Sequence, residues 1–216
     1  MKRGDMDGKP LSRRDGGSGM HICLGLGSNI GNTEDNLLKA LSLIKSAASA
    51  PRSPLAGAAM SGISSVYLSS PVGNVNQPYF LNCAVMLVMP GAKDYAVFGR
   101  RLLSVLKNIE KNMGRKNESV RYMPRIIDID ILFVYDNVQK NFITLDLPEL
   151  KLPHPEIFNR RFVLSPLFDL SYNLNKPFDE ESIKKALAEL ENLDAGALQK
   201  ISYYGKFDEQ LTRILR

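Results

Sequence analysis

Apolar residues along this chain occur either in short continuous runs or at helical spacings of three and four. The continuous runs predict four buried strands, over 21–26, 63–68, 80–89 and 126–135. The helical spacings predict amphipathic helices over 33–46, 94–112 and 180–190, and a short apolar helix is expected over 162–170. Thr33 is expected to cap the first helix, and Gly114 is expected to close the second in a left-handed conformation.

The order of these elements predicts an α+β fold with a mainly antiparallel sheet and flanking helices. The strands at 63–68 and 80–89 follow one another, and their linker is too short for the crossover helix that a parallel pair needs. Segment 46–62 is rich in small residues, proline and glycine, and is expected to be a loop or an insertion. Residues 1–20 hold almost no large apolar side chains, so we expect a disordered leader there.

Composition and charge narrow the class of protein without identifying it. The hydrophobic fraction of 44% is enough for a core, and the net charge of +5 suits an ordinary soluble protein or one with an anionic ligand. Cys23 and Cys83 stand in apolar runs and are expected to be buried free thiols. No run reaches the roughly 18 apolar residues of a membrane span, and no signal or transit peptide is recognisable, so we expect a cytoplasmic protein.

Two acidic residues stand in the strongest predicted strand, which reads IIDIDILFVY. Asp128 and Asp130 are two positions apart, so both side chains are expected on one face of the strand. Ile127, Ile129 and Ile131 then face the other way. Two exposed acids on a solvated sheet face are the plain interpretation, and a pair of hard oxygen ligands for Mg²⁺, as in ATP chemistry, is the functional one.

Four basic residues come shortly before these acids: Arg115, Lys116, Arg121 and Arg125. Guanidinium groups beside metal-binding carboxylates suit a polyphosphate, because they bind phosphate oxygens in a bidentate manner. Arg125 follows Pro124 and stands three residues before Asp128, so it can reach the same site from the start of the strand. A solvated basic loop is the alternative.

Two further segments hold candidate binding residues. GLGSNIG does not have the spacing of a dinucleotide-binding loop, and we expect Gly25 and Gly27 to allow close packing instead. Phe80 and Asn82 share a face at a strand start, where a ring and an amide can stack on and hydrogen-bond a flat heterocycle. Core and turn roles are the alternatives for these two residues.

Five segments occur in the order and spacing of one enzyme family. They are LGLGSNIGN, the 67–82 stretch with SSPVG and QPYFLN, IEKNMGR, RYMPRIIDIDIL and LPHPEIFNRRFVLSPL. Across roughly residues 21–190 the chain resembles the hydroxymethyldihydropterin pyrophosphokinases. The resemblance implies a ferredoxin-like α+β sandwich and an enzyme of folate synthesis, which moves diphosphate from ATP to 6-hydroxymethyl-7,8-dihydropterin and releases AMP. Residues 191–216 lie outside the resemblance and are expected to form a C-terminal extension.

The resemblance also implies roles for particular residues. Asp128 and Asp130 are implied to bind two Mg²⁺ ions, with Arg115 and Arg125 catalytic beside them. ATP contacts are implied for Glu110, Arg125, Ile131, His154 and Arg160. The pterin pocket is implied to consist of Ser69, Ser70, Val72, Phe80, Asn82 and Phe162, with Tyr122 closing over it. The polar loop 115–125 is predicted to close as a lid. ATP and a small pterin are the expected partners, with neither nucleic acid nor membrane.

Two other functions fit parts of the pattern. An RNA-binding module is one, since ferredoxin-like sheets with basic loops bind RNA, but it needs exposed aromatics on the central strands, where this chain has IIDIDILF. A catalytically silent relative that serves as a scaffold is the other, and the intact aspartates and arginines argue against it. The sequence leaves the oligomeric state open.

Overall fold

The computed structural model describes residues 19–72, 76–115, 123–171, 174–192 and 199–216. The helices in these ranges are α1 (Thr33–Ser49), α2 (Tyr95–Asn112), the short 3-10 helix η1 (Ile157–Asn159), α3 (Arg161–Leu170) and α4 (Glu180–Asn192). The strands are β1 (Gly19–Ser28), β2 (Ala59–Ile63), β3 (Val66–Ser69), β4 (Phe80–Pro90), β5 (Asp128–Asp136), β6 (Asn141–Phe142), β7 (Leu145–Leu147), β8 (Leu150–Leu152), β9 (Ile201–Phe207) and β10 (Ile214–Leu215).

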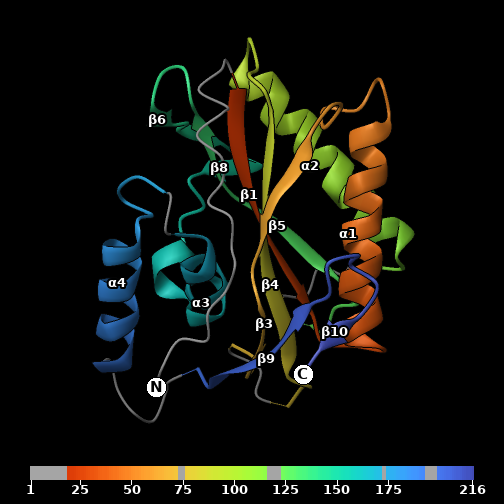
Figure 1. Ribbon diagram of the computed structural model, residues 1–216, viewed down its shortest axis with the longest axis vertical. Helices are drawn as coiled ribbons and strands as arrows, with labels where there is room; N and C mark the ends of the chain where they lie inside the picture. The colour runs from red at the N-terminus through yellow and green to blue at the C-terminus, as the bar shows by residue number, and fades with distance from the viewer. Residues whose placement is uncertain (1–18, 73–75, 116–122, 172–173, 193–198) are drawn as a thin grey trace.

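The main sheet has the strand order β10-β9-β3-β4-β1-β5-β6, with β2 also paired to β4 (Figure 1). β1 lies between β4 and β5 and is antiparallel to both. Because α1 follows β1 and α2 follows β4, the elements β1, α1, β3, β4, α2 and β5 form a ferredoxin-like βαββαβ unit. The predicted α+β fold with a mainly antiparallel sheet is confirmed.

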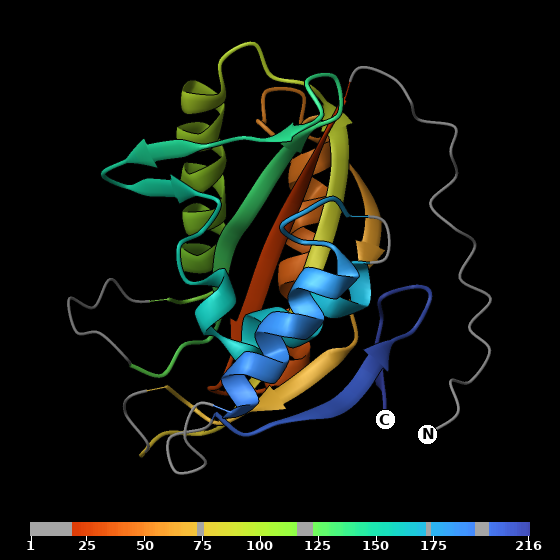
Figure 2. The same cartoon turned by 90° about the vertical axis from the view of Figure 1, so that its left-hand side faces the viewer.

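Helices cover both faces of this sheet. α1 and α2 lie on one face and α3 and α4 on the other, and Figure 2 looks at the sheet through α3 and α4. Each face has its own apolar core, one containing Leu37, Leu102 and Ile129 and the other Phe133 and Leu167. Burial of apolar surface on both sides therefore holds the central strands, which carry the candidate site, in a rigid layer.

The helix ends partly follow the predictions. Asn32, not Thr33, caps α1, because its side-chain oxygen accepts from the backbone N–H of Asp35 at 3.4 Å, and Thr33 is the first helical residue. The cap predicted at Thr33 was therefore wrong by one position. Gly114 adopts a φ of +98° just after α2, which confirms the expected left-handed closure.

The interpretation of 46–62 as a loop was wrong at both ends. α1 continues to Ser49, since alanine and serine side chains pack there without a helix breaker. β2 then pairs with the half of β4 that the four-residue β3 leaves unpaired, because β4 is 11 residues long. The single strand predicted over 63–68 is for the same reason two strands, β2 and β3, which both pair with β4.

Both ends of the described chain join the sheet. β1 begins at Gly19 and Met20 is fully buried, so the sheet starts two residues earlier than the predicted leader allows. The disorder predicted for residues 1–18 falls outside the described residues. β9, in the predicted C-terminal extension, pairs antiparallel with β3.

The two cysteines and the helix lengths also bear on the sequence predictions. Cys23 and Cys83 are buried and unbonded to each other, as expected. In the described part of the chain, no helix is both long and apolar enough to cross a membrane.

Candidate active site

A cavity of about 280 Å³ lies on the α3 side of the sheet, between the last residues of β1, the first halves of β4 and β5, and the start of α3. Most of the predicted site residues line it. They are Ser69, Ser70, Val72, Phe80, Asn82, Arg125, Asp128, Asp130, Arg160 and Phe162. Residues predicted from segments far apart in the sequence are thus brought together around one space.

β5 supplies an acidic wall. Asp128 and Asp130 both line the cavity, while Ile129 and Ile131 are buried in the core on the opposite face of the strand. The two-residue period of an extended strand produces this separation, as predicted. Two carboxylates therefore stand side by side at a surface that a ligand can reach.

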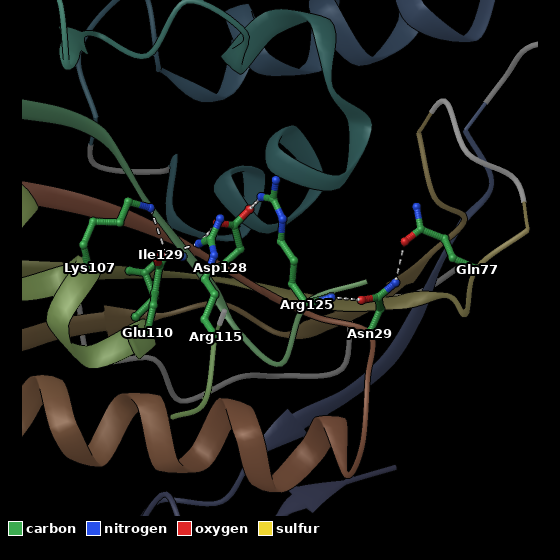
Figure 3. A network of polar contacts seen from close by, with 8 residues as sticks. All are labelled: Asn29, Gln77, Lys107, Glu110, Arg115, Arg125, Asp128 and Ile129. Carbon is green, nitrogen blue, oxygen red and sulfur yellow. Dashed lines mark hydrogen bonds and ion pairs between the residues drawn. The ribbon is translucent and has the colours of Figure 1, made fainter. Parts of the chain in front are cut away.

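Two arginines bind Asp128 from different segments (Figure 3). Nη1 of Arg115, just after α2, lies 2.6 Å from Oδ1 of Asp128. Arg125, just before β5, forms an ion pair with Oδ2 of the same carboxylate. Arg125 lines the cavity and Arg115 does not, so the two cations approach Asp128 from the cavity side and from behind it.

Glu110 is the buried residue that supports this network from behind. Its Oε2 lies 2.6 Å from Nη1 of Arg115, and its Oε1 accepts from the backbone N–H of Ile129 at 2.7 Å. Lys107 reaches Oε1 as well, at 3.0 Å. Because the Glu110 side chain is only 2% exposed, it fixes the arginine behind the cavity and does not face the cavity itself.

Burial and neighbouring charges move the pKa values of the two aspartates in opposite directions. Burial raises the pKa of Asp130, and the negative charge of Asp128 raises it further. Burial acts on Asp128 in the same sense, but Arg125 and Arg115 outweigh it and hold the pKa of Asp128 below its usual range. The charged form is therefore favoured at Asp128 and disfavoured at Asp130 in the free protein.

The opposite wall of the cavity is aromatic and amide. Phe80 and Asn82 come from β4 and Phe162 from α3. Nδ2 of Asn82 donates to Oγ of Ser69 at 3.0 Å, which fixes the amide against β3. The guanidinium of Arg160 lies 5.8 Å from the centre of the Phe162 ring, so a cation stands at the border of the aromatic wall.

Asn29 ties three loops around the cavity together (Figure 3). Its Oδ1 accepts from the backbone N–H of Arg125 at 2.7 Å, and its Nδ2 donates to Oε1 of Gln77 and to the carbonyl of Pro78, each at 3.1 Å. Its own backbone N–H donates to the carbonyl of Arg125 at 3.0 Å. This buried asparagine therefore connects the turn after β1 to the segments before β4 and before β5.

Several predicted residues stand outside the cavity lining. The side chain of Ile131 is packed in the core, and Glu110 and Arg115 lie behind Asp128. The backbone N–H of His154 donates to the carbonyl of Leu132 at 2.7 Å, and burial lowers the pKa of its imidazole. Tyr122 and most of the predicted lid at 115–125 lie outside the described residues.

Sequence reasoning did not single out some residues that line the cavity, among them Gln77, Leu132, Asn159, Val163, Pro166 and Gln199. Most of them stand inside segments that the sequence analysis quoted, such as QPYFLN and LPHPEIFNRRFVLSPL. Gln199 does not, because it belongs to the predicted C-terminal extension. Local spacing could not have indicated a residue whose place depends on the pairing of β9 with β3.

The donor set allows a metal only together with a ligand. Among the described residues, no group of three or more His, Cys, Asp and Glu side chains forms a site for a metal ion. Asp128 and Asp130 face the cavity as neighbours on one strand, and Glu156 is a further acid in the cavity lining. Mg²⁺ commonly binds through one or two carboxylates plus substrate phosphates and water, so this pair fits that ion and not an all-protein cage.

Comparison with known proteins agrees with the fold and identifies a family. A crystal structure described as HPPK-DHPS in complex with substrates matches with a TM-score of 0.51 over 85% of this chain and 48% of that chain, at 14% identity. That likeness supports the fold alone. Residues 23–172 match the sequence profile of the family described as 7,8-dihydro-6-hydroxymethylpterin-pyrophosphokinase (HPPK).

Curated relatives fall into two groups by length. The Folate synthesis bifunctional protein of Arabidopsis thaliana is 39% identical over 69% of this chain, and the chain spans only 26% of that relative. The 2-amino-4-hydroxy-6-hydroxymethyldihydropteridine pyrophosphokinases of Bacillus subtilis and Aquifex aeolicus are each 33% identical, over 71% and 76% of this chain. Those matches cover 79% and 88% of the two bacterial proteins. The chain therefore belongs to the 7,8-dihydro-6-hydroxymethylpterin-pyrophosphokinase family.

Proposed function

We propose that this protein transfers diphosphate from ATP to the hydroxymethyl oxygen of 6-hydroxymethyl-7,8-dihydropterin and releases AMP, as a step of folate synthesis. The observation that carries the proposal is one cavity with two chemically different walls. One wall has aromatic and amide groups, and the other has carboxylates and a guanidinium. A reaction between a flat heterocycle and a polyphosphate needs both walls, facing one space.

The aromatic wall is the place for the pterin. Phe80 and Phe162 present rings to the cavity, on which a planar bicyclic ligand stacks. Asn82 offers amide groups for the donors and acceptors along the edge of the pterin, and its position is fixed by its bond to Ser69. Rings with a fixed amide orient the hydroxymethyl group toward β5.

The charged wall is the place for the triphosphate. Arg125 lines the cavity, and Arg115 stands behind Asp128 within 2.6 Å of it. In the proposed reaction the hydroxymethyl oxygen loses its proton to water and attacks the β-phosphorus, and the bond from that phosphorus to the AMP oxygen breaks with its electron pair on AMP. The arginines stabilise the negative charge that moves onto the bridging and leaving oxygens.

Asp128 and Asp130 are the residues that would hold Mg²⁺, with the phosphates of ATP completing the coordination. When bound, the metal offsets phosphate charge and makes the phosphorus easier to attack. The raised pKa of Asp130 and the two arginines on Asp128 give the acids different roles. The carboxylate of Asp128 would serve the metal together with Arg115 and Arg125, whereas Asp130 would gain a positive neighbour that favours its charged form. The family resemblance implies two ions, and that number is part of the proposal.

The covered sheet favours a small-molecule enzyme over the RNA-binding alternative. RNA stacks on aromatic side chains of an open sheet face, and here α3 and α4 cover the face on which the cavity lies. The aromatic residues of the site are confined to a cavity of about 280 Å³. A silent scaffold would not need the arginine pair that binds Asp128.

The cellular location stays a prediction. The sequence favours the cytoplasm, whereas two plant relatives have the word mitochondrial in their names.

The test is chromatography of nucleotides and pterins after incubation with ATP, Mg²⁺ and 6-hydroxymethyl-7,8-dihydropterin. The proposal predicts AMP that appears only when the pterin is present, together with a pterin diphosphate. The matched control without pterin measures any ATP hydrolysis. Formation of ADP, or AMP release that is independent of the pterin, would contradict the proposal.

A further inference from the structure

The segment 199–216 packs directly against the site although the family match ends at residue 172. β9 forms a strand along β3, which leads into the cavity wall. At the end of that pairing, the backbone N–H of Ser70 donates to the carbonyl of Lys200 at 2.9 Å, and the N–H of Lys200 donates to Oγ of Ser70 at 3.0 Å. A segment outside the family match therefore holds a residue of the cavity wall.

Gln199 joins the two sides of the aromatic wall. Its Nε2 donates to the carbonyl of Ser70 at 2.9 Å, and its Oε1 accepts from the backbone N–H of Phe162 at 3.2 Å. Ser70, Phe162 and Gln199 all line the cavity. One side chain thus spans from the end of β3 to the start of α3, the two elements between which the pterin is assigned.

The hydrogen bond from Phe162 satisfies a backbone N–H in the first turn of α3. The first backbone N–H groups of a helix have no partner within the helix, and a side chain just before the helix usually supplies one. Here Arg160 stands at that position and makes no capping hydrogen bond. Gln199, which is 37 positions after Phe162, supplies the acceptor for the Phe162 N–H instead. The backbone carbonyl of Gln199 also accepts from Nη1 of Arg161 at 3.2 Å.

The far end of the segment is anchored as well, so Gln199 is presented from a fixed element. β10 pairs with β9, and Phe207 and Ile214 are buried in the main core. Nη2 of Arg216 lies 2.6 Å from Oε1 of Glu34 in the first turn of α1, and the hydroxyl of Tyr204 donates to the same oxygen. The segment is therefore an integral part of the domain over its described length.

We propose that Gln199 is a positioning residue for the pterin and that segment 199–216 helps to form the pterin site by holding Gln199 at the cavity wall. Loss of the Gln199 amide leaves the carbonyl of Ser70 and the N–H of Phe162 without these partners, and both groups lie at the cavity wall. The wall then loosens where the heterocycle binds, while Asp128, Asp130 and Arg125 keep their own contacts. The inference rests on the proposed function, since it concerns the same ligand.

The test is a fluorescence titration of 6-hydroxymethyl-7,8-dihydropterin in the presence of Mg²⁺ and α,β-methylene-ATP, an analogue that cannot be cleaved at the reacting bond. We expect Gln199→Ala to raise the pterin Kd about tenfold, the loss expected for hydrogen bonds that hold a binding wall. The Kd of the ATP analogue and the melting temperature should stay near the wild-type values. Gln199→Glu keeps the shape of the side chain and the acceptor for Phe162 but loses the donor to Ser70. It should therefore also raise the Kd of the pterin and leave the Kd of the ATP analogue unchanged. Gln210→Ala, which changes an exposed glutamine of the same segment, is the control.

The outcomes separate this inference from the proposed function. A wild type that binds the pterin, with both Gln199 variants binding it equally well, shows that the inference is wrong and leaves the proposed function standing. If a Gln199 variant binds the pterin and the ATP analogue more weakly by the same factor, the inference is also wrong, because general damage to the fold gives that result. A wild type that binds no pterin refutes the proposed function, and the inference with it.

Discussion

Asp128 and Asp130 differ in what already surrounds them, although they stand two positions apart on β5. Asp128 forms ion pairs with Arg115 and Arg125, and its pKa is held low by them against the effect of burial. Asp130 has a raised pKa, from burial first and then from the charge of Asp128. The charged form is therefore favoured at Asp128 and disfavoured at Asp130.

Replacing either acid is expected to remove metal-dependent function and to preserve the fold. Asp128→Ala and Asp130→Ala each delete a hard oxygen ligand but also relieve repulsion between two carboxylates, and Arg115 keeps its bond to Glu110. Calorimetric titration of ATP with and without Mg²⁺ should show loss of the Mg²⁺-dependent part of the affinity, with turnover lost as well. Asp146→Ala changes an acid whose side chain is 80% exposed and is the matched control. Near-normal turnover in either site variant would refute the metal role.

The two arginines are expected to differ in their effects. Arg125 lines the cavity, so Arg125→Ala should lower kcat on the order of 10²-fold or more, as for a lost charge partner of the transition state. Arg115→Ala should also lower kcat, with a smaller effect on ATP affinity, because this arginine stands behind Asp128. Steady-state kinetics with ATP as the varied substrate measures both effects. Arg100→Ala, which breaks a surface ion pair with Glu149, should leave kcat unchanged.

Gly27 shows how closely the aromatic wall of the cavity is packed. A Cβ added there would lie 3.2 Å from Oδ1 of Asn82 and 3.8 Å from Cδ1 of Phe80. Gly27→Ala should therefore displace the Asn82 amide by a few tenths of an ångström and raise KM for the pterin more than KM for ATP. Gly91→Ala is the control, since nothing lies within 4 Å of a Cβ added there. Unchanged pterin kinetics in Gly27→Ala would show that the Asn82 amide is not part of the pterin site.

At the scale of whole elements, polar contacts fix the angle between α2 and β5. Glu110 of α2 accepts from the backbone N–H of Ile129, and Tyr95 at the start of α2 donates to Asp136 at the end of β5. The two contacts lie at opposite ends of the helix. The first supports the charged wall of the cavity, and the second is far from it, so the stability of this packing can be tested without touching the site.

The Tyr95–Asp136 bond makes a prediction about pH. The hydroxyl of Tyr95 is the main cause that lowers the pKa of Asp136, with backbone N–H groups of the following turn adding to it. A carboxyl whose pKa is lower in the folded than in the unfolded state stabilises the fold above its unfolded pKa of roughly 3.9, and this contribution is lost as the pH falls through the folded pKa. Tyr95→Phe should therefore cost about 1 kcal/mol at pH 7 and progressively less below about pH 4.

Urea unfolding at several pH values measures that difference. Tyr203→Phe removes a hydroxyl from a tyrosine that is 58% exposed and is the control. A loss of stability in Tyr95→Phe that is the same at pH 7 and at pH 3 would contradict the assignment to Asp136.

The elements also show what a sequence can and cannot predict. The β5 carboxylates were predictable because strand period alone places Asp128 and Asp130 on one face and Ile129 in the core. β2 was not predictable, because its residues AMSGI have no strand-forming pattern. They pair with β4 only because β4 extends beyond β3. Gln199 was not predictable either, because its contact with Ser70 spans 129 positions and depends on the pairing of β9 with β3.

At the scale of the whole molecule, a ferredoxin-like sheet covered by helices on both faces carries its site in one cavity on the α3 side. The family match covers residues 23–172, and the cavity walls and the charge network support the proposed reaction through different residues. β9, which lies outside the family match, pairs with β3, and Gln199 just before it donates to the carbonyl of Ser70 at the cavity wall. The strands from β9 to β5 therefore all contribute to the surroundings of this one cavity.

Phosphorus NMR of a single reaction mixture tests the proposed diphosphate transfer most directly, because it identifies which bond of ATP breaks. The mixture contains the protein, ATP, Mg²⁺ and 6-hydroxymethyl-7,8-dihydropterin. Attack at the β-phosphorus predicts an AMP resonance and the two coupled resonances of a pterin diphosphate, growing in equal amounts. Resonances of ADP with a pterin monophosphate, or of free inorganic phosphate without any pterin product, would contradict it.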